Sequence, residues 1–488
     1  MFSQVLNQIR VNHPDSVDTH ELLMAAVRGM VQAADPHSYV IPAIRLEPAK
    51  ETALRDGKLH PVPIQFTFID GAPVVISIDA GSRAAELDIL PGDELVAADR
   101  KPIIAESPEE LSIILAGPRR SAIALEFERR RTDGSLVRIE RRVEREPSAE
   151  RPGVPAAFML DKVTGYMRIT TFAGDKVADD VHAALGGLEK QGMQRLILDV
   201  RGNGGGRIDQ AADVAGEFLP KGTVLYSSSG RKAEVGDTVR VKRSFWRSER
   251  RYPIVLLVNE GSASASELVA GALQDHDRAL VVGRPTFGKS LLMRGFPMSD
   301  GSAIVLVVGH VKTPCGRVVQ RQYRTVTRRE YYRLAGAAGD TAGRPSCKTA
   351  NGRTVYGGGG IYPDVVLPER EPAPVWLARI YEEAIPLAWV GGYISSPAAS
   401  RTTLEALAAA PTLPPAALED FRTLARKRGI TIPPGPEADA WLQGALVLRV
   451  AAAKWGDAGY YRVIASVDPE IGDAARTFDR AAALLSTR

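Results

Sequence analysis

The stretch 253–283, PIVLLVNEGSASASELVAGALQDHDRALVVG, decides the fold class because it contains two buried strands with a helix between them. PIVLLV and ALVVG are short apolar runs of strand length, and SELVAGALQDHDRA between them is typical of a helix. Strands that are joined through a crossover helix pair in parallel, whereas a short turn would give a hairpin. The stretch therefore predicts an α/β unit.

The residues upstream continue the same alternation of strands and helices. GYMRITTF (165–172) and RLILDV (195–200) are typical of strands, and the segments 177–192 and 209–219 are typical of helices. Strands that alternate with crossover helices imply a mixed α/β core with a substantially parallel sheet. Functional sites in such sheets lie where the strands end, so we expect a site at the loops after 200 and 258.

The rest of the chain divides into three further regions, since 488 residues are too many for one core. We expect a helical segment over 1–60, whose clearest helix is 17–35, and a mainly-β domain with one good helix over 61–146. The linker PSAERPGVP then opens the core region 147–368, and Pro-rich breaks separate helices over 369–488.

The overall composition excludes several classes of protein. The 62 Lys and Arg residues are interspersed with 58 Asp and Glu residues, which argues against a nucleic-acid surface. No apolar run approaches the ~20 residues that would cross a bilayer, and MFSQVLNQIRVNHPDSVDTHE lacks the pattern of a secretory signal. The two cysteines, Cys315 and Cys347, have no zinc-site spacing, and either one bridge or two separate buried thiols fits them.

The loop GSASAS, which precedes the helix in the opening stretch, offers small hydroxyl groups at a helix N-terminus. Free N–H groups and the positive end of the helix dipole can stabilise negative charge there, so a serine in the loop could be a nucleophile. Ser262, Ser264 and Ser266 could equally be N-cap residues. The loop alone leaves both interpretations open.

A second loop, RGNGGGR at 201–207, has three consecutive glycines that can turn backbone N–H groups toward a ligand. Its spacing matches neither of the glycine motifs that bind nucleotides. An oxyanion hole and a plain tight turn both remain open.

A third loop, PTFGKS, places Lys289 before a mostly apolar continuation, LLMRGF. Apolar surroundings disfavour a charged amine, so the pKa of such a lysine falls and the neutral amine can take a proton from a serine. A surface lysine in a loop is the simpler alternative.

Together these loops resemble the catalytic region of the C-terminal processing peptidases, the S41 family of serine proteases with a Ser–Lys dyad. The resemblance rests on VLLVNEGSASASELVAGALQDHDRALVVGRPTFGKS and on LILDVRGNGGG, which is similar to the family's DLRxNxGG loop. It continues through DGSAIVLVV, TPCGRVVQ and GGGGIYPDVVLP, so that it covers most of 160–368.

The resemblance implies roles for individual residues of this chain. It makes Ser264 the nucleophile and Lys289, 25 residues later, the general base. It implies an oxyanion hole formed by the N–H groups of Ala265 and of Gly205 or Gly206, and two such donors are what acyl transfer needs.

Two positions bear on how the lysine is held. The family usually has a glutamine four residues after the lysine, whereas this chain has Met293, whose thioether cannot replace an amide hydrogen bond. Glu267 follows Ser264 by one helical turn, and a carboxylate beside Lys289 would favour the protonated amine. We therefore expect Glu267 to cap the helix or to face away.

Upstream, AGSRAAELDILPGDELVAADRKPI resembles a PDZ segment, with Gly92 and Asp93 in the matching turn. A PDZ-like domain over 61–146 would bind an extended peptide by adding it to a sheet edge and would capture its terminal carboxylate. Pro61 and Pro63 remove N–H donors where such a carboxylate loop is expected, so the domain could instead gate access to the site.

The resemblance implies a crotonase-like, ClpP-type α/β catalytic core with a PDZ-like domain and helical terminal regions. The expected function is serine endopeptidase activity near the C-termini of unfolded or tagged proteins, with no cofactor and no metal. The alternatives are an inactive peptide-binding scaffold and acyl-CoA chemistry on the related crotonase-type fold. The family resemblance further implies a periplasmic setting with an export signal absent from this chain, and it leaves a homodimer and an adaptor protein open.

Overall fold

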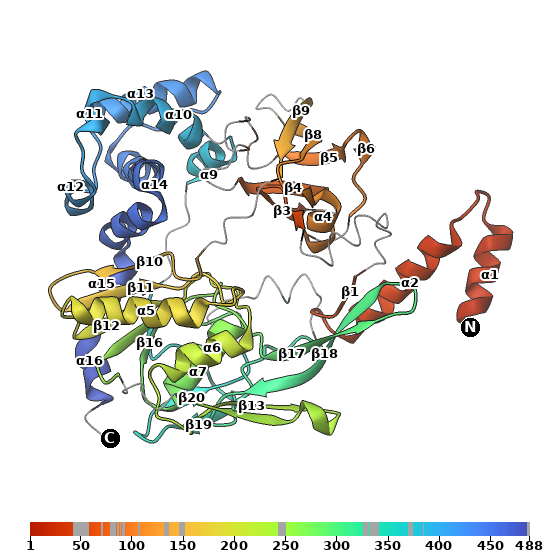
Figure 1. Ribbon diagram of the computed structural model, residues 1–488, viewed down its shortest axis with the longest axis horizontal. Helices are drawn as coiled ribbons and strands as arrows, with labels where there is room; N and C mark the ends of the chain where they lie inside the picture. Colours follow the sequence, from red (N-terminus) through yellow and green to blue (C-terminus); the bar gives the residue numbers. More distant parts are fainter. Residues whose placement is uncertain are drawn as a thin grey trace. The chain divides into compact units, whose positions relative to one another are not determined.

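The computed structural model forms two compact units, each built from separate stretches of the chain (Figure 1). Unit 1 comprises Met1–Ile44, Met159–Pro368 and Ala474–Arg488, and unit 2 comprises Arg45–Phe158 and Glu369–Asp473. The structure describes residues 1–41, 58–69, 72–78, 84, 87, 89, 93–105, 108–130, 136–145, 152–242, 250–325, 331, 341–368, 374–383 and 385–485. Within the described part of the chain, no helix is both long and apolar enough to cross a membrane.

The core of unit 1 is a six-stranded sheet in which the four pairings from β11 to β21 are parallel, as the alternation of strands and helices predicts. Its strands, in spatial order, are β10 (Ala156–Met159), β11 (Thr164–Arg168), β12 (Arg195–Asp199), β15 (Ile254–Val258), β16 (Leu280–Gly283) and β21 (Val365–Val366). The crossover helices are α5 (Val177–Lys190), α6 (Ile208–Gly216) and α7 (Ala265–Asp275). All five residues of β15 are buried, which explains its uninterrupted apolar run.

A second sheet in unit 1 is antiparallel in its resolved pairings and carries the segment that follows the lysine loop. It has the order β1 (Tyr39–Ile41), β18 (Ala303–Lys312), β13 (Val224–Gly230) and β14 (Asp237–Arg240), and β17 (Leu291–Pro297) also pairs with β18. Smaller elements are the 3₁₀ helix Ala233–Val235 and the hairpin of β19 (Ser346–Lys348) and β20 (Thr354–Tyr356).

The N-terminal region holds two helices, α1 (Phe2–Asn12) and α2 (Thr19–Ala34). The predicted start of α2 is confirmed, because the Asp18 carboxylate accepts the N–H groups of His20 and Glu21. The sequence reading did not identify α1, which has no buried residue.

The β-rich part of unit 2 is mainly β with one helix of eight residues, as the sequence predicts for 61–146. Its strands form the order β3 (Ile64–Ile69), β4 (Ala72–Ile78), β5 (Glu94–Ala98), β8 (Ala122–Arg130) and β9 (Leu136–Glu144), with β6 (Lys101–Pro102) paired to β5. The helix α4 (Pro108–Leu115) and the pair β2 (Leu59–His60) and β7 (Gly117–Pro118) complete it. Gly92 and residues 147–151 of the expected linker lie outside the described residues, while Asp93 is buried and paired with Arg129 at 2.7 Å.

The helical part of unit 2 packs around its own apolar cluster, which includes the buried Trp389, Phe421 and Leu446. Its helices are α9 (Val375–Glu382), α10 (Ile385–Ile394), α11 (Pro397–Ser400), α12 (Leu404–Ala409), α13 (Pro415–Lys427) and α14 (Pro436–Val467), followed by α15 (Pro469–Ala475) at the unit boundary.

The last residues of the chain differ from the expected grouping of 369–488, because α16 (Phe478–Ala483) packs on unit 1. Phe478 is buried under the guanidinium of Arg195, which lies 4.6 Å from its ring centre. The amphipathic pattern of a helix predicts a buried face, but it cannot predict against which core that face packs.

Candidate active site

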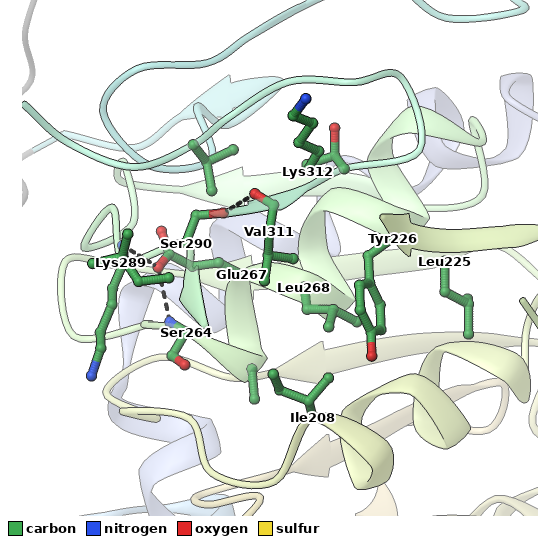
Figure 2. A pocket seen from close by; sticks show the side chains of 14 residues that line it. Ile208, Leu225, Tyr226, Ser264, Glu267, Leu268, Lys289, Ser290, Val311 and Lys312 are labelled. Carbon is green, nitrogen blue, oxygen red and sulfur yellow. Dashed lines mark hydrogen bonds between the residues drawn. The ribbon is translucent and has the colours of Figure 1, made fainter. Parts of the chain in front are cut away.

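Ser264 lies at the sharp turn between β15 and α7, where it is the N-cap of the helix. Its backbone has φ 56° and ψ −112°, a left-handed conformation that a residue with a Cβ rarely adopts. Such strain persists only where the surrounding structure holds it, and it often marks a functional position. The turn presents Ser264 to a pocket that also contains Lys289 (Figure 2).

The three serines of the loop separate clearly in the structure. The Ser262 hydroxyl donates to Val200 O at 2.8 Å, the Ser266 hydroxyl donates to Asn203 O at 2.8 Å, and both residues are fully buried. Only Ser264 of the three lines the pocket. The N-cap interpretation applies to Ser264, and the nucleophile interpretation stays a prediction for this residue, while Ser262 and Ser266 join the loop to Val200 and Asn203.

Lys289 lies in the loop between β16 and β17 and lines the same end of the pocket as Ser264 (Figure 2). Burial lowers the pKa of Lys289, and the nearby carboxylate of Glu267 acts in the opposite direction. The lowered pKa agrees with the sequence argument. Among the described residues, no hydrogen bond joins the Lys289 amine to the Ser264 hydroxyl, although both residues line the same pocket.

The apolar end of the pocket extends away from these two residues. The larger apolar and aromatic residues of the whole pocket lining are Ile208, Leu225, Tyr226, Leu268, Leu291, Val311 and Val319. Tyr226 lies at this end in Figure 2, away from Ser264 and Lys289. A pocket of this composition favours an apolar group beside the serine.

Glu267 joins the serine turn to the lysine loop and is 1% exposed. Its carboxylate accepts the N–H groups of Ser264 at 2.9 Å, of Gly288 at 2.7 Å and of Lys289 at 2.8 Å, and also the Thr286 hydroxyl at 2.6 Å. Burial raises the pKa of Glu267 to about 7 despite these four donors. The residue caps the helix, as expected, but its contact with the lysine loop was not foreseen from the sequence.

The glycine loop is anchored by a buried carboxylate at the end of β12. Asp199 accepts hydrogen bonds from Arg168 at 2.7 Å, from Arg201 at 2.7 Å and from the Tyr166 hydroxyl at 2.8 Å. Burial by itself would raise the pKa of Asp199, but the two guanidinium groups hold it below its ordinary value. Asp199 therefore remains a carboxylate and fixes the start of the loop.

Gly205 touches the serine turn directly. A Cβ at this position would lie 2.9 Å from Ser264 Cβ and 3.0 Å from the nitrogen of Ala265, which only glycine permits. The N–H of Gly205 already donates to Asn203 Oδ1 at 2.9 Å. The structure thus places Gly205 against the serine turn, and the choice between Gly205 and Gly206 as an oxyanion donor stays a prediction.

Comparison with known proteins fits this geometry. Residues 163–327 match peptidase family S41. The chain is 29% identical to the carboxy-terminal-processing protease of Bartonella bacilliformis over 324 residues, which cover 65% of this chain and 72% of that protein. Residues 163–327 are therefore similar to the peptidase domain of family S41.

Two further comparisons show the extent of the similarity. The chain is 35% identical to the carboxyl-terminal-processing protease of Synechocystis over 48% of its own length and 53% of the relative, so it spans about half of that protein. Among solved structures, the photosystem II D1 C-terminal processing protease aligns with 24% identity and a TM-score of 0.43 over 69% of this chain and 91% of that one.

Met293 is not among the residues that line the pocket. It lies in β17 and pairs with Val307 of β18, after a register shift between Leu292 and Met293. Of the β17 residues, Leu291 and not Met293 lines the described pocket. Whatever holds the lysine loop must therefore come from elsewhere.

The two cysteines form a disulfide, Cys315–Cys347, which decides between the alternatives that the sequence left open. Asp275 lies close enough to both sulfurs for the three residues to form a group with metal-ligand spacing, but Asp275 is already paired with the buried Arg317. Sulfurs in a disulfide do not offer thiolate ligands, so Asp275, Cys315 and Cys347 do not form a metal site while the disulfide is intact.

Proposed function

We propose that the chain is an endopeptidase that cleaves protein substrates near their C-termini, with Ser264 as nucleophile and Lys289 as general base. The observation that carries the proposal is the position of Ser264, strained at a strand-to-helix turn and facing a pocket that it shares with a lysine of lowered pKa. A buried neutral amine beside a serine hydroxyl is the pair of groups that Ser–Lys acyl transfer uses.

In the proposed reaction, neutral Lys289 takes the proton of the Ser264 hydroxyl as its oxygen attacks the scissile carbonyl carbon. The oxyanion that forms would accept the N–H of Ala265, at the N-terminus of α7, and the N–H of Gly205 or Gly206 in the glycine loop. The Lys289 ammonium then gives its proton to the leaving amine, and the C–N bond breaks to leave an ester on Ser264. A water molecule, deprotonated by Lys289, hydrolyses that ester and restores the serine.

The substrate class follows from the lining of the pocket. The apolar side chains around Leu225, Leu268 and Val311 would take an apolar side chain next to the scissile bond. We therefore propose cleavage after small or medium apolar residues in unfolded or tagged protein tails.

We propose that the β-rich part of unit 2 is a PDZ-like domain that binds these tails. In its described sheet, β3 is an edge strand, and α4 lies against it. An exposed edge can accept an extended peptide as an additional strand. Pro61 and Pro63 stand just before β3 without N–H donors, so strand addition is better supported than capture of the terminal carboxylate.

An extracytoplasmic and specifically periplasmic setting is part of the same proposal. The Cys315–Cys347 disulfide supports it, because such bonds persist in oxidising compartments. A homodimer and an adaptor protein are further proposals that arise from the family resemblance alone. We also propose, from the family resemblance alone, that the mixed α/β core is related to the crotonase fold.

The test is cleavage of an unfolded model protein such as casein by the purified chain, Ser264→Ala and Lys289→Ala, with Lys221→Ala as an exposed-lysine control. We expect both dyad variants to lose at least about 10³-fold in rate, while the control keeps the parent rate. Labelling of Ser264 by a fluorophosphonate, read by mass spectrometry, identifies the nucleophile independently. An inert parent that still binds peptides through 61–146 would favour the scaffold alternative.

A further inference from the structure

The lysine loop is held on its C-terminal side by a residue far along the chain. The N–H of Ser290, directly after Lys289, donates to Gln320 Oε1 at 2.9 Å, and the Ser290 hydroxyl donates to Val311 O. Ser290 and Gln320 are 7% and 8% exposed. A buried N–H that loses its acceptor is costly, so this contact constrains the backbone at Lys289 strongly.

The amide of Gln320 can adopt only one orientation. Its nitrogen donates to the Tyr331 hydroxyl at 3.0 Å and to the carbonyl of Arg321 at 3.0 Å. Both amide hydrogens are therefore used, and a flipped amide would place its NH₂ group against the N–H of Ser290. The oxygen of Gln320 is thereby directed at the lysine loop.

Tyr331 completes the network and is fully buried. Its hydroxyl lies 2.8 Å from His37 Nε2, and its ring packs edge-on against Phe287 of the lysine loop with centres 6.1 Å apart. His37 belongs to the N-terminal segment that Ser38 joins to β18 through a hydrogen bond from Val307 N. Three distant parts of unit 1 thus meet behind Lys289.

We propose that Gln320 is a positioning residue for Lys289, acting through the N–H of Ser290 and fixed in turn by Tyr331. The proposal rests on the proposed function, because positioning matters only if Lys289 is the base. Lys289 itself contacts neither Gln320 nor Tyr331 through any hydrogen bond in the described residues. Gln320 would act by keeping the loop where the amine stays beside Ser264 and out of bulk water.

The variants that test this are Gln320→Leu, which removes both the acceptor and the donors, and Gln320→Glu, which keeps an acceptor for Ser290. Gln210→Ala is the matched control, since Gln210 is also 8% exposed and accepts a backbone N–H, that of Ala178, at 3.0 Å. We expect Gln320→Leu to lower kcat about 10–100-fold with KM changed less than about 2-fold. Gln320→Glu should recover most of that loss, and Gln210→Ala should keep the parent kcat.

The second measurement does not need activity. Trace acetylation of amines with acetic anhydride across a range of pH, read by mass spectrometry on a Ser264→Ala background, gives the pKa of Lys289 directly. Glu267 and Lys312, the charged groups that share its pocket, and the neighbouring Arg321 are present in every variant. Because burial is what lowers this pKa, a misplaced amine should titrate at higher pH in Gln320→Leu than in the parent.

The two readouts separate the outcomes. A higher pKa of Lys289 in Gln320→Leu, with lower kcat, supports the proposal. If the parent cleaves nothing but the pKa of Lys289 still rises in Gln320→Leu, Gln320 remains a positioning residue. The peptidase mechanism is then overturned instead. An unchanged titration of Lys289 in Gln320→Leu, or an equal change in Gln210→Ala, would overturn the proposal itself.

Discussion

The serine loop and the lysine loop of unit 1 are held in different ways. The serine loop is fixed by its own residues and by the glycine loop: Asn259 Oδ1 accepts the N–H groups of Gly202 and Gly261, and Ala263 donates to Asn203 O. The lysine loop is fixed in part by Glu267, which accepts the N–H groups of Gly288 and Lys289. It is also fixed by later segments: Arg321 donates to Gly288 O, and Gln320 accepts from Ser290.

The difference reflects where the two loops lie. The serine and glycine loops end the neighbouring parallel strands β15 and β12, so the sheet itself brings them together. The lysine loop follows β16, and three of its described partners, Gln320, Arg321 and Ile361, belong to no helix or strand. A sheet can place the nucleophile, whereas the base depends on contacts that have no regular pattern.

The largest effect is expected from disturbing the serine side with Gly205→Ala. The new Cβ would lie 2.8 Å from Ala263 O and 2.9 Å from Ser264 Cβ, and Gly205 has φ 104°. Because backbone must move at the nucleophile, we expect kcat/KM for casein to fall about 10²–10³-fold.

Gly192→Ala is its matched control, since Gly192 has φ 92° but open space around the new Cβ. Both variants carry the same kind of backbone strain, and only one crowds the serine. Equal losses in the two would show that strain, and not contact with the turn, limits activity.

The next effect concerns Glu267, which joins the two loops. Its pKa in the folded protein is about 7, above the ordinary value of about 4.5 that the unfolded chain would show. The folded state therefore binds this proton more tightly, and the stability it contributes is full below pH 4.5 and is lost as pH rises through 7. The shift corresponds to about 3 kcal/mol, or about 10² in the unfolding equilibrium.

The measurement compares the parent with Glu267→Gln at pH 5 and pH 8, using hydrogen exchange of peptides that contain β15. The stability difference between the two proteins should move in favour of Glu267→Gln by up to about 3 kcal/mol as pH rises. Glu234→Gln, at an exposed glutamate of the same unit, should show no such trend. A constant difference at all pH values would mean that Glu267 titrates near its ordinary pKa.

Much of this architecture could be predicted from the sequence. The run Ile254–Val258 and the turn after it gave the parallel sheet and the position of Ser264, because strand periodicity is a local property. The roles of Gln320 and Tyr331 could not be predicted, since hydrogen bonds between residues 30 or more positions from the loop leave no periodic signal. Met293 in place of the usual glutamine indicated that Lys289 must be held in another way, but the sequence could not show which residue holds it.

The smallest effect is expected on the lysine side, from Gly360→Ala. A Cβ there would lie 2.3 Å from Thr286 O and 2.8 Å from Thr286 Oγ1, the hydroxyl that donates to Glu267 and accepts the N–H of Ile361. Thr286 must shift, but it is three residues from Lys289, and Gln320 still holds Ser290. We therefore expect kcat to fall about 10-fold with KM nearly unchanged.

Gly352→Ala, which has a similar positive φ of 80° and open space, should keep the parent kcat. If Gly360→Ala cost as much as Gly205→Ala, the lysine loop would be as rigidly coupled to the site as the serine turn, and the contrast between them would fail.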